Sequence, residues 1–283
     1  MKAFEFLWNE FVYGGHWGSL TSSAIALSIM IILNLHIRLD FLVIVYLGTQ
    51  CIYSYNHYRE RDSDSLSDSR RAEFLINYHA SIRYITIIYG ILFILLLIIF
   101  HSWTILGFGT LLLGLGILFT YRAKSLSQKI VGFKSIYASF AWSLLVPFTI
   151  LYVQYPIDIS VVLLTIFVFF RFMVDTSFFD IKDIESDKQK NLKTYVLYFG
   201  KEKALSILHV INLISFIPLL IGVLFNYLPQ FSLSLFFILF YNIYYIERAR
   251  GRKVDIQSLS YIIVDGEYYY WPLVLLCGMI FLQ

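Results

Sequence analysis

The sequence predicts an all-α membrane protein, a polytopic bundle of about nine transmembrane helices around a central cavity. Hydrophobic residues make up 59% of the 283 positions and charged residues only 14%. The mean hydropathy of +0.71 also lies outside the range of soluble globular domains. The apolar runs are continuous and long enough to cross a hydrocarbon core of roughly 30 Å as helices. Strands of a membrane barrel would be shorter and would alternate apolar with polar residues.

Nine candidate spans follow one another along the chain. They cover residues 19–37, 40–58, 80–100, 103–120, 135–154, 159–179, 204–226, 231–247 and 260–282. The longest polar stretches each join two of these spans, so no room remains for a second domain. We therefore expect residues 1–283 to form a single transmembrane domain.

The basic residues predict how this bundle is oriented. Of the 22 Lys and Arg residues, 20 fall on one side of a nine-span chain. Because cytoplasmic loops are enriched in Lys and Arg, we expect a protein of the inner, cytoplasmic membrane with its N-terminus in the cytoplasm. The net charge of +3 is explained by attraction of these loops to an anionic leaflet. It predicts membrane lipid, and no nucleic acid, as a partner.

Two acidic motifs lie at the cytoplasmic ends of apolar spans. Their oxygen-bearing side chains are Asn56, Glu60 and Asp64, and then Asp180, Asp183 and Asp187. Spacings of three and four residues place each set along one face of a helix. Mg²⁺ is typically held by a few carboxylates together with substrate phosphates. Either motif alone is explained by a solvated helix end, whereas two on one membrane side favour a metal-bridged diphosphate site.

These motifs resemble those of the UbiA-type intramembrane prenyltransferases, which read roughly N-D-x-x-D-x-x-x-D and D-x-x-D-x-x-x-D. Residues 180–187, DIKDIESD, match the second pattern completely. Residues 56–64, NHYRERDSD, depart from the first, because His57 and Glu60 stand where the family has Asp. Residues 121–124, YRAK, and the spacing of Thr194 and Gly200 also resemble family segments. With nine spans, the resemblance covers nearly the whole chain.

The resemblance implies a transferase that joins the isoprenyl group of a prenyl diphosphate to a lipophilic, aromatic acceptor of the quinone type. Two Mg²⁺ ions would bridge the diphosphate, and no obligate protein partner is expected. The six motif side chains would ligate the metal. The expected catalytic residues are Asp64, Asp180, Lys124 and Arg171. The expected diphosphate-binding residues are Arg122, Lys124, Lys182 and Lys188, and the expected acceptor-binding residues are Tyr121 and Asp265.

Several of these residues have a structural interpretation as well. The basic side chains also set topology and contact lipid headgroups. Arg171 falls inside a span, where a cation is costly unless it faces a polar cavity or a partner, and we expect that partner on another helix. Asp265 and Glu267 are equally suited to capping a helix or to pairing with Arg250 or Lys253.

Two other functions remain open at this point. The altered first motif permits a terpene cyclase of the same fold, which would release a hydrocarbon or alcohol without any acceptor. Arg171 and the acidic motifs also suit a transporter, although carboxylates of a transport pathway are expected near the bilayer midplane and these lie at span ends. Ion transport in proteoliposomes without turnover of prenyl diphosphate would favour the latter.

Overall fold

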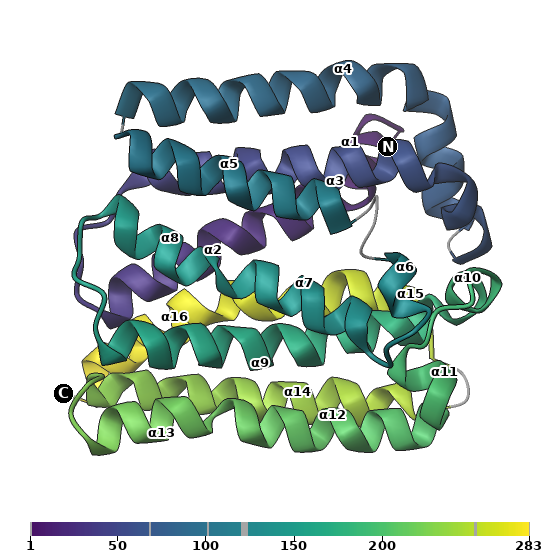
Figure 1. The fold of residues 1–283 in the computed structure, drawn as a ribbon. Helices are drawn as coiled ribbons and strands as arrows, with labels where there is room; N and C mark the ends of the chain where they lie inside the picture. The colour runs from purple at the N-terminus through teal and green to yellow at the C-terminus, as the bar shows by residue number, and fades with distance from the viewer. Residues whose placement is uncertain (1, 68, 101, 120–123, 252–253, 283) are drawn as a thin grey trace.

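The computed structural model describes the backbone of residues 2–67, 69–100, 102–119, 124–251 and 254–282. Helices run along a common direction and no strand occurs in these ranges, which confirms the predicted all-α bundle (Figure 1). The first nine helices are α1 (Lys2–Tyr13), α2 (His16–Ile32), α3 (Leu39–Ser67), α4 (Ser69–Phe100), α5 (Trp103–Leu118), α6 (Lys124–Ser127), α7 (Phe133–Ser143), α8 (Leu145–Tyr152) and α9 (Ile159–Lys182). The rest are α10 (Ile184–Gln189), α11 (Tyr195–Phe199), α12 (Lys201–Ser215), α13 (Ile217–Leu224), the 3₁₀ segment η2 (Gln230–Leu235), α14 (Phe236–Ala249), α15 (Ile256–Ser258), the π-helical segment η3 (Leu259–Val264) and α16 (Glu267–Phe281).

Every predicted apolar span coincides with a helix or with a pair of helices in line, but the count of nine crossings is not confirmed. Within the described ranges, four stretches are long and apolar enough to cross a membrane, namely Ser81–Phe100, Phe133–Tyr152, Ile159–Lys182 and Lys201–Leu224. A pair bent by 62°, Leu7–Tyr13 with His16–Ile32, raises the number to five. Helices such as α5 and α16, with 16 and 15 residues, fall short of the roughly 20 residues that a straight crossing needs.

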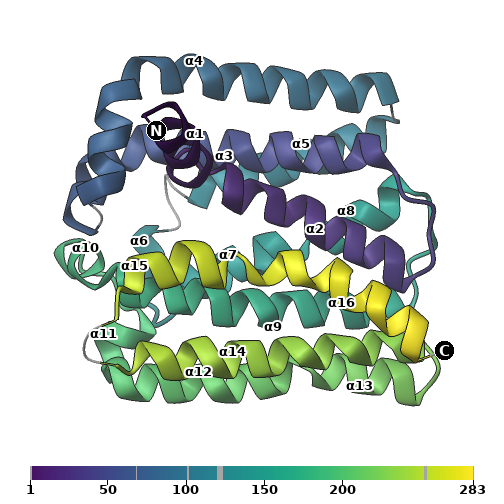
Figure 2. The ribbon, with the colours of Figure 1, turned by 180° about the vertical axis from the view of Figure 1, so that it is seen from behind.

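The two ends of the bundle differ in character. One end collects the short helices α6, α10, α11 and α15, which belong to the Lys- and Arg-rich connections, and we call it the basic end (Figure 1). The opposite end holds short turns and the C-terminus (Figure 2). Three of these turns begin at residues with positive φ, Asn34 (49°), Gln154 (56°) and Asn226 (58°). A left-handed residue after a helix ends it sharply, so the chain reverses within a few residues.

The helices lie in layers, with α4 at one outer edge and α12, α13 and α14 at the other (Figures 1 and 2). Between them, α9 contacts α7, α8, α12 and α13 and so forms the centre of the second half. A continuous core of aromatic and aliphatic side chains, among them Phe41, Phe148, Phe167 and Trp271, joins the halves. Outward positions are apolar too, as at Ile88, Ile91 and Ile98 on α4, as expected of helices that face lipid.

Candidate active site

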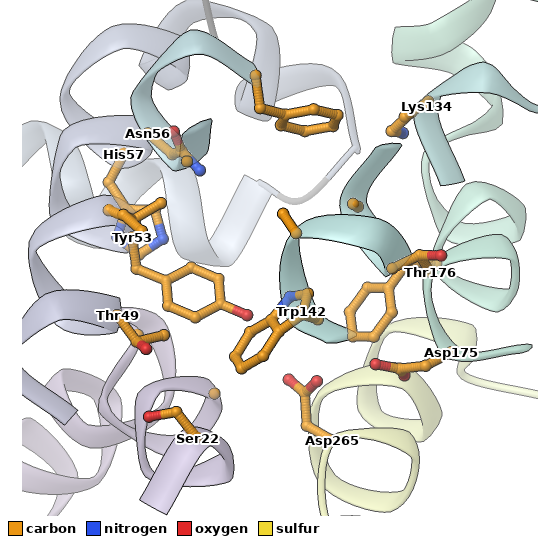
Figure 3. A pocket seen from close by; sticks show the side chains of 18 of the residues that line it. Ser22, Thr49, Tyr53, Asn56, His57, Lys134, Trp142, Asp175, Thr176 and Asp265 are labelled. Carbon is orange, nitrogen blue, oxygen red and sulfur yellow. The ribbon is translucent and has the colours of Figure 1, made fainter. Parts of the chain in front are cut away.

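A cavity of about 350 Å³ lies between the two halves of the bundle, and Lys134, Lys182 and Arg71 are among the residues that line it. Its wall is formed by helices α1, α2, α3, α4, α5, α7, α8 and α9, by the segment η3 and by Asp265 just before α16. Asn56, His57 and Lys134 lie in the upper part of the close view, and Asp175 and Asp265 lie in the lower part (Figure 3). The ring of Tyr53 and the indole of Trp142 project between them (Figure 3). The wall thus combines a charged region with aromatic surfaces.

Lys134 holds the second acidic motif together. Its Nζ lies 2.9 Å from Asp180 Oδ1, 3.7 Å from Asp183 Oδ2 and 2.9 Å from Asp187 Oδ2. Ser135 adds a hydrogen bond from its Oγ to Asp180 Oδ2 at 3.0 Å. The carboxylate of Asp180 is fully buried, and buried carboxylates require counter-charges and hydrogen bonds. Lys134 supplies one positive charge to all three.

The second motif does not lie on one helix face, contrary to the expectation from its spacing. Helix α9 ends at Lys182, and Asp183 joins it to α10 with φ −93° and ψ 11°. This break turns α10 back, and the amide of Asp187 donates to the Asp183 carbonyl at 2.8 Å. The three carboxylates still meet, because the turn brings Asp187 round to Lys134.

The position of Lys134 is fixed by the backbone that precedes it. Gly132 has φ +72°, and a Cβ there would lie 2.4 Å from the ring of Tyr195. Its amide donates to the Lys193 carbonyl at 2.7 Å, and the Lys193 amide donates to the Ser127 carbonyl at the same distance. The connection before α7 is therefore bonded directly to the segment after the second motif, which places Lys134 beside that motif.

Three further polar residues form the cavity wall next to Lys134. Lys182 Nζ lies 3.1 Å from Asp183 Oδ1 and donates to the hydroxyl of Tyr261 at 3.0 Å. Arg71 on α4 donates to the same hydroxyl at 3.1 Å. Burial would raise the pKa of the Asp183 carboxyl, but the ammonium groups of Lys182 and Lys134 outweigh burial and hold this pKa at about 2. Asp183 is thus an ionised carboxylate flanked by cations.

The first motif reaches the same region from α3. Asn56 and His57 line the cavity, and α3 continues as a helix to Ser67, so Asn56, Glu60 and Asp64 occupy successive turns. This helix confirms the spacing argument for the first motif. The side chains of Glu60 and Asp64 lie outside the described part of the structure. His57 is buried, so it belongs to the cavity wall and not to the surface.

Arg171, which the sequence predicts to be catalytic, is not among the residues that line the cavity. Its guanidinium is fully buried and lies 2.5 Å from Glu267 Oε1. It also donates to the side-chain oxygens of Asn212, at 2.6 Å, and Asn242. Asn242 in turn donates to Glu267 Oε2 at 2.6 Å. These four side chains, the Arg171 cluster, come from α9, α12, α14 and α16. The carboxylate of Glu267 neutralises the guanidinium of Arg171, because a charge inside a membrane protein requires a partner. This cluster links the four helices.

The other expected site residues divide into two groups. Lys182 and Asp265 line the cavity. Lys188 is exposed on α10 and lines a separate surface groove with Glu185 and Lys193, so it does not reach the cavity. Tyr121 and Arg122 and the side chain of Lys124 lie outside the described residues.

The model of the UbiA prenyltransferase family matches residues 17–264. This chain belongs to the UbiA prenyltransferase family. No curated protein sequence matches it at a significant level.

Solved UbiA homologues share the fold over their whole length. A homologue from Aeropyrum pernix K1 without ligand is 12% identical, with a TM-score of 0.67 over 93% of this chain and 96% of that one. A homologue from Archaeoglobus fulgidus bound to GPP and Mg²⁺ is 15% identical, with a TM-score of 0.66 over 95% and 99%. A digeranylgeranylglyceryl phosphate synthase is 14% identical, with a TM-score of 0.62 over 98% and 99%. The chain therefore has the membrane-embedded fold of this family.

Mg²⁺ fits the donors of this UbiA-type cavity, although the described side chains do not assemble a metal site by themselves. No group of three Asp, Glu, His or Cys side chains among the described residues is placed to hold a metal ion. The carboxylates of Asp180 and Asp187 contact Lys134, while Asp183 and Asn56 line the cavity. Carboxylate and amide oxygens are ligands that Mg²⁺ prefers, so the chemistry of the donor set suits the ion.

Sequence reasoning missed Lys134, Arg71 and Asp175 as site residues. Lys134 counted only as one of the basic residues that set topology, and Arg71 likewise. The sequence does contain an indication for Lys134. It directly precedes the predicted apolar span at 135–154, and a lysine at that position needs a partner. Asp175 carries a similar signal as a carboxylate within the span at 159–179.

Proposed function

We propose that this chain is a Mg²⁺-dependent prenyltransferase, which transfers an isoprenyl group from a prenyl diphosphate to a lipophilic aromatic acceptor of the quinone type. One observation carries the proposal: Lys134, Lys182 and Arg71 converge with Asn56 and Asp183 in one part of a cavity that also has aromatic and apolar walls. A diphosphate leaving group develops negative charge that cations stabilise. The GPP and Mg²⁺ bound by the Archaeoglobus homologue support the same substrate class.

Mg²⁺ bound at this site would act as a Lewis acid toward the leaving diphosphate. The proposed ligands are the six motif residues, Asn56, Glu60, Asp64, Asp180, Asp183 and Asp187, with Asp64 and Asp180 the most direct candidates for a catalytic effect. The cavity cations Lys182 and Arg71, together with Arg122 and with Lys124 at the start of α6, would bind the diphosphate oxygens.

The aromatic wall has a role after the carbon–oxygen bond of the substrate breaks. An allylic cation is stabilised by the faces of aromatic rings, and Tyr53, Trp142 and Phe179 line the cavity. The apolar side chains of Leu112 and Leu145 suit the isoprenyl chain. The acceptor captures the cation at C1 of the prenyl group and loses a proton, with Tyr121 and Asp265 as the proposed acceptor-binding residues.

The deciding experiment measures release of pyrophosphate by the purified protein with prenyl diphosphates of several lengths. We expect release with Mg²⁺ and none with EDTA. The double variant Asp64→Ala/Asp180→Ala should lose at least about a hundredfold in rate. Mg²⁺ would lose two of its proposed ligands, and its positive charge would no longer stabilise the leaving diphosphate. Glu185→Ala is the matched control, since Glu185 is exposed outside the cavity. A rate retained in the double variant would contradict this site.

Analysis of the products separates transfer from cyclisation. With a transferase, prenylated product forms only when an acceptor is added. A hydrocarbon or terpene alcohol formed without acceptor would instead identify a cyclase of the same fold.

A further inference from the structure

Two carboxylates in the cavity have no part in the diphosphate site. Asp175 on α9 and Asp265, just before α16, both line the cavity and lie in the lower part of Figure 3, whereas Lys134 lies in its upper part. Asp175 is only 5% exposed. Its Oδ2 accepts a hydrogen bond from the Tyr268 hydroxyl at 3.5 Å, while its Oδ1 has no hydrogen-bond partner. A buried oxygen without a partner is costly, so a ligand that donates a hydrogen bond would stabilise this site.

A flat aromatic surface lies beside these carboxylates. The indole of Trp142 stacks on Phe172 with 4.5 Å between centroids and 7° between planes. Phe172 stacks in turn on Tyr268 at 4.7 Å and 14°. Trp142 is therefore held in place from behind and presents its other face to the cavity, where Figure 3 shows it next to Tyr53 and Asp265. Such a face suits an aromatic ring of the ligand.

The charges of the wall decide which ring fits. The cations Lys134 and Lys182 contact Asp183 and its neighbours, and in the proposed reaction the diphosphate takes up the remaining positive charge. Asp175 interacts electrostatically with Asp265, and Lys182 and Arg71 offset part of the charge of Asp265. A carboxylate-bearing acceptor would add a further negative group beside this buried pair, and like charges in a poorly hydrated site are strongly unfavourable.

We propose that Asp175 and Asp265 form the recognition site for the acceptor, and that the acceptor is a neutral aromatic ring with hydroxyl groups and not an aromatic acid. One hydroxyl donates to Oδ1 of Asp175, another group of the ring donates to Asp265, and Trp142 stacks on the ring. This inference rests on the proposed prenyltransferase function and specifies its second substrate class.

The test compares two probes of nearly equal size, hydroquinone and 4-hydroxybenzoate, which differ by a hydroxyl group against a carboxylate. Binding to the purified protein is measured by quenching of tryptophan fluorescence in the presence of Mg²⁺ and pyrophosphate. We expect hydroquinone to bind roughly tenfold more tightly than 4-hydroxybenzoate. In Asp175→Asn and in Asp265→Asn this preference should fall to about twofold or less, chiefly because 4-hydroxybenzoate binds better.

An improved affinity for the acid is a result that misfolding cannot produce, and thermal unfolding of each variant checks its integrity. Glu185→Gln is the control with the same change of charge outside the cavity, and it should keep the wild-type preference. Equal affinities of the wild-type protein for both probes, no measurable binding of hydroquinone, or an unchanged preference in Asp175→Asn would each overturn the inference. Pyrophosphate release by the wild-type protein in the same preparation shows separately whether the proposed function holds.

Discussion

Lys134 places a single ammonium group among three carboxylates, at 2.9 to 3.7 Å from each. Breaking a buried ion pair by removing one partner leaves uncompensated charge and costs roughly 3–5 kcal/mol. Lys134 therefore stabilises the protein when no metal is bound and competes with a divalent ion for the same oxygens. The same argument of buried charge applies to Arg171 and Glu267, where the partners are fixed by two asparagines.

Lys134→Met should make stability depend on divalent metal. Without metal, the three carboxylates lose their counter-charge, so we expect a lower midpoint of thermal unfolding than in the wild-type protein. Added Mg²⁺ should raise the midpoint of the variant more than that of the wild type, because the ion replaces the missing charge. Lys129→Met is the control at an exposed position. Equal Mg²⁺ shifts in Lys134→Met and wild type would show that Lys134 and the metal do not compete.

Arg171→Leu should destabilise the protein by roughly 3–5 kcal/mol, because Glu267 is left as an unpaired buried charge. The double variant Arg171→Leu/Glu267→Gln should recover part of this loss, since neither charge remains. Chemical or thermal unfolding of the four proteins in detergent gives the coupling energy. A fully stable Arg171→Leu that has lost only pyrophosphate release would restore the catalytic interpretation.

At the scale of elements, two breaks in the helices position the site. The first is the break at Asp183, which turns α10 back so that Asp187 reaches Lys134. The second is the left-handed Gly132 before α7, whose amide bonds to the Lys193 carbonyl. These breaks bring the charged residues of the two helices together. If the chain continued as a straight helix through Gly132 and Asp183, the charged residues of α7 and α9 would not face each other.

Gly132→Ala should disturb the site through this second break. An alanine with φ near +72° costs roughly 1–2 kcal/mol, and its Cβ would lie 2.4 Å from Tyr195. We expect a lower unfolding midpoint and a slower release of pyrophosphate, because Lys134 shifts with the start of α7. Gly114→Ala is the matched control, since a Cβ there has no atom within 4 Å. Wild-type behaviour of Gly132→Ala would mean that the loop tolerates the change.

At the scale of the whole molecule, the basic connections share one end and the short turns share the other (Figures 1 and 2). Helices α3 and α9 carry their acidic motifs to the same end, although more than 110 residues separate Asp64 from Asp180 in the sequence. The bundle thus separates a charged region at the basic end from an apolar interior and an apolar outer surface. We propose that this end faces the cytoplasm.

Labelling of single cysteines tests this orientation. In a background of Cys51→Ala and Cys277→Ala, Ser125→Cys lies exposed at the basic end and Ser102→Cys lies exposed at the opposite end. We expect a membrane-impermeant maleimide to label Ser102→Cys in intact cells and Ser125→Cys only after the membrane is opened. The reverse pattern would place the active site on the outer side.

Hydropathy and spacing predicted much of this protein because they act locally. Long apolar runs dictated helices, and the four-residue spacing of Asn56, Glu60 and Asp64 dictated one face of α3, since α3 continues unbroken to Ser67. The same reasoning failed for the second motif. There the spacing of Asp180 and Asp183 suggested a continuous helix, but the chain turns at Asp183.

The sequence by itself determined the helical membrane bundle and the two stretches that carry the acidic motifs, because periodicity and charge depend on neighbouring residues. Only the tertiary structure decided which cations meet which carboxylates. It assigned Lys134 to the second motif and Arg171 to Glu267, and it brought Asp175 and Asp265 to one cavity. These pairings join residues between 46 and 96 positions apart on different elements, where contact depends on packing and leaves no local pattern.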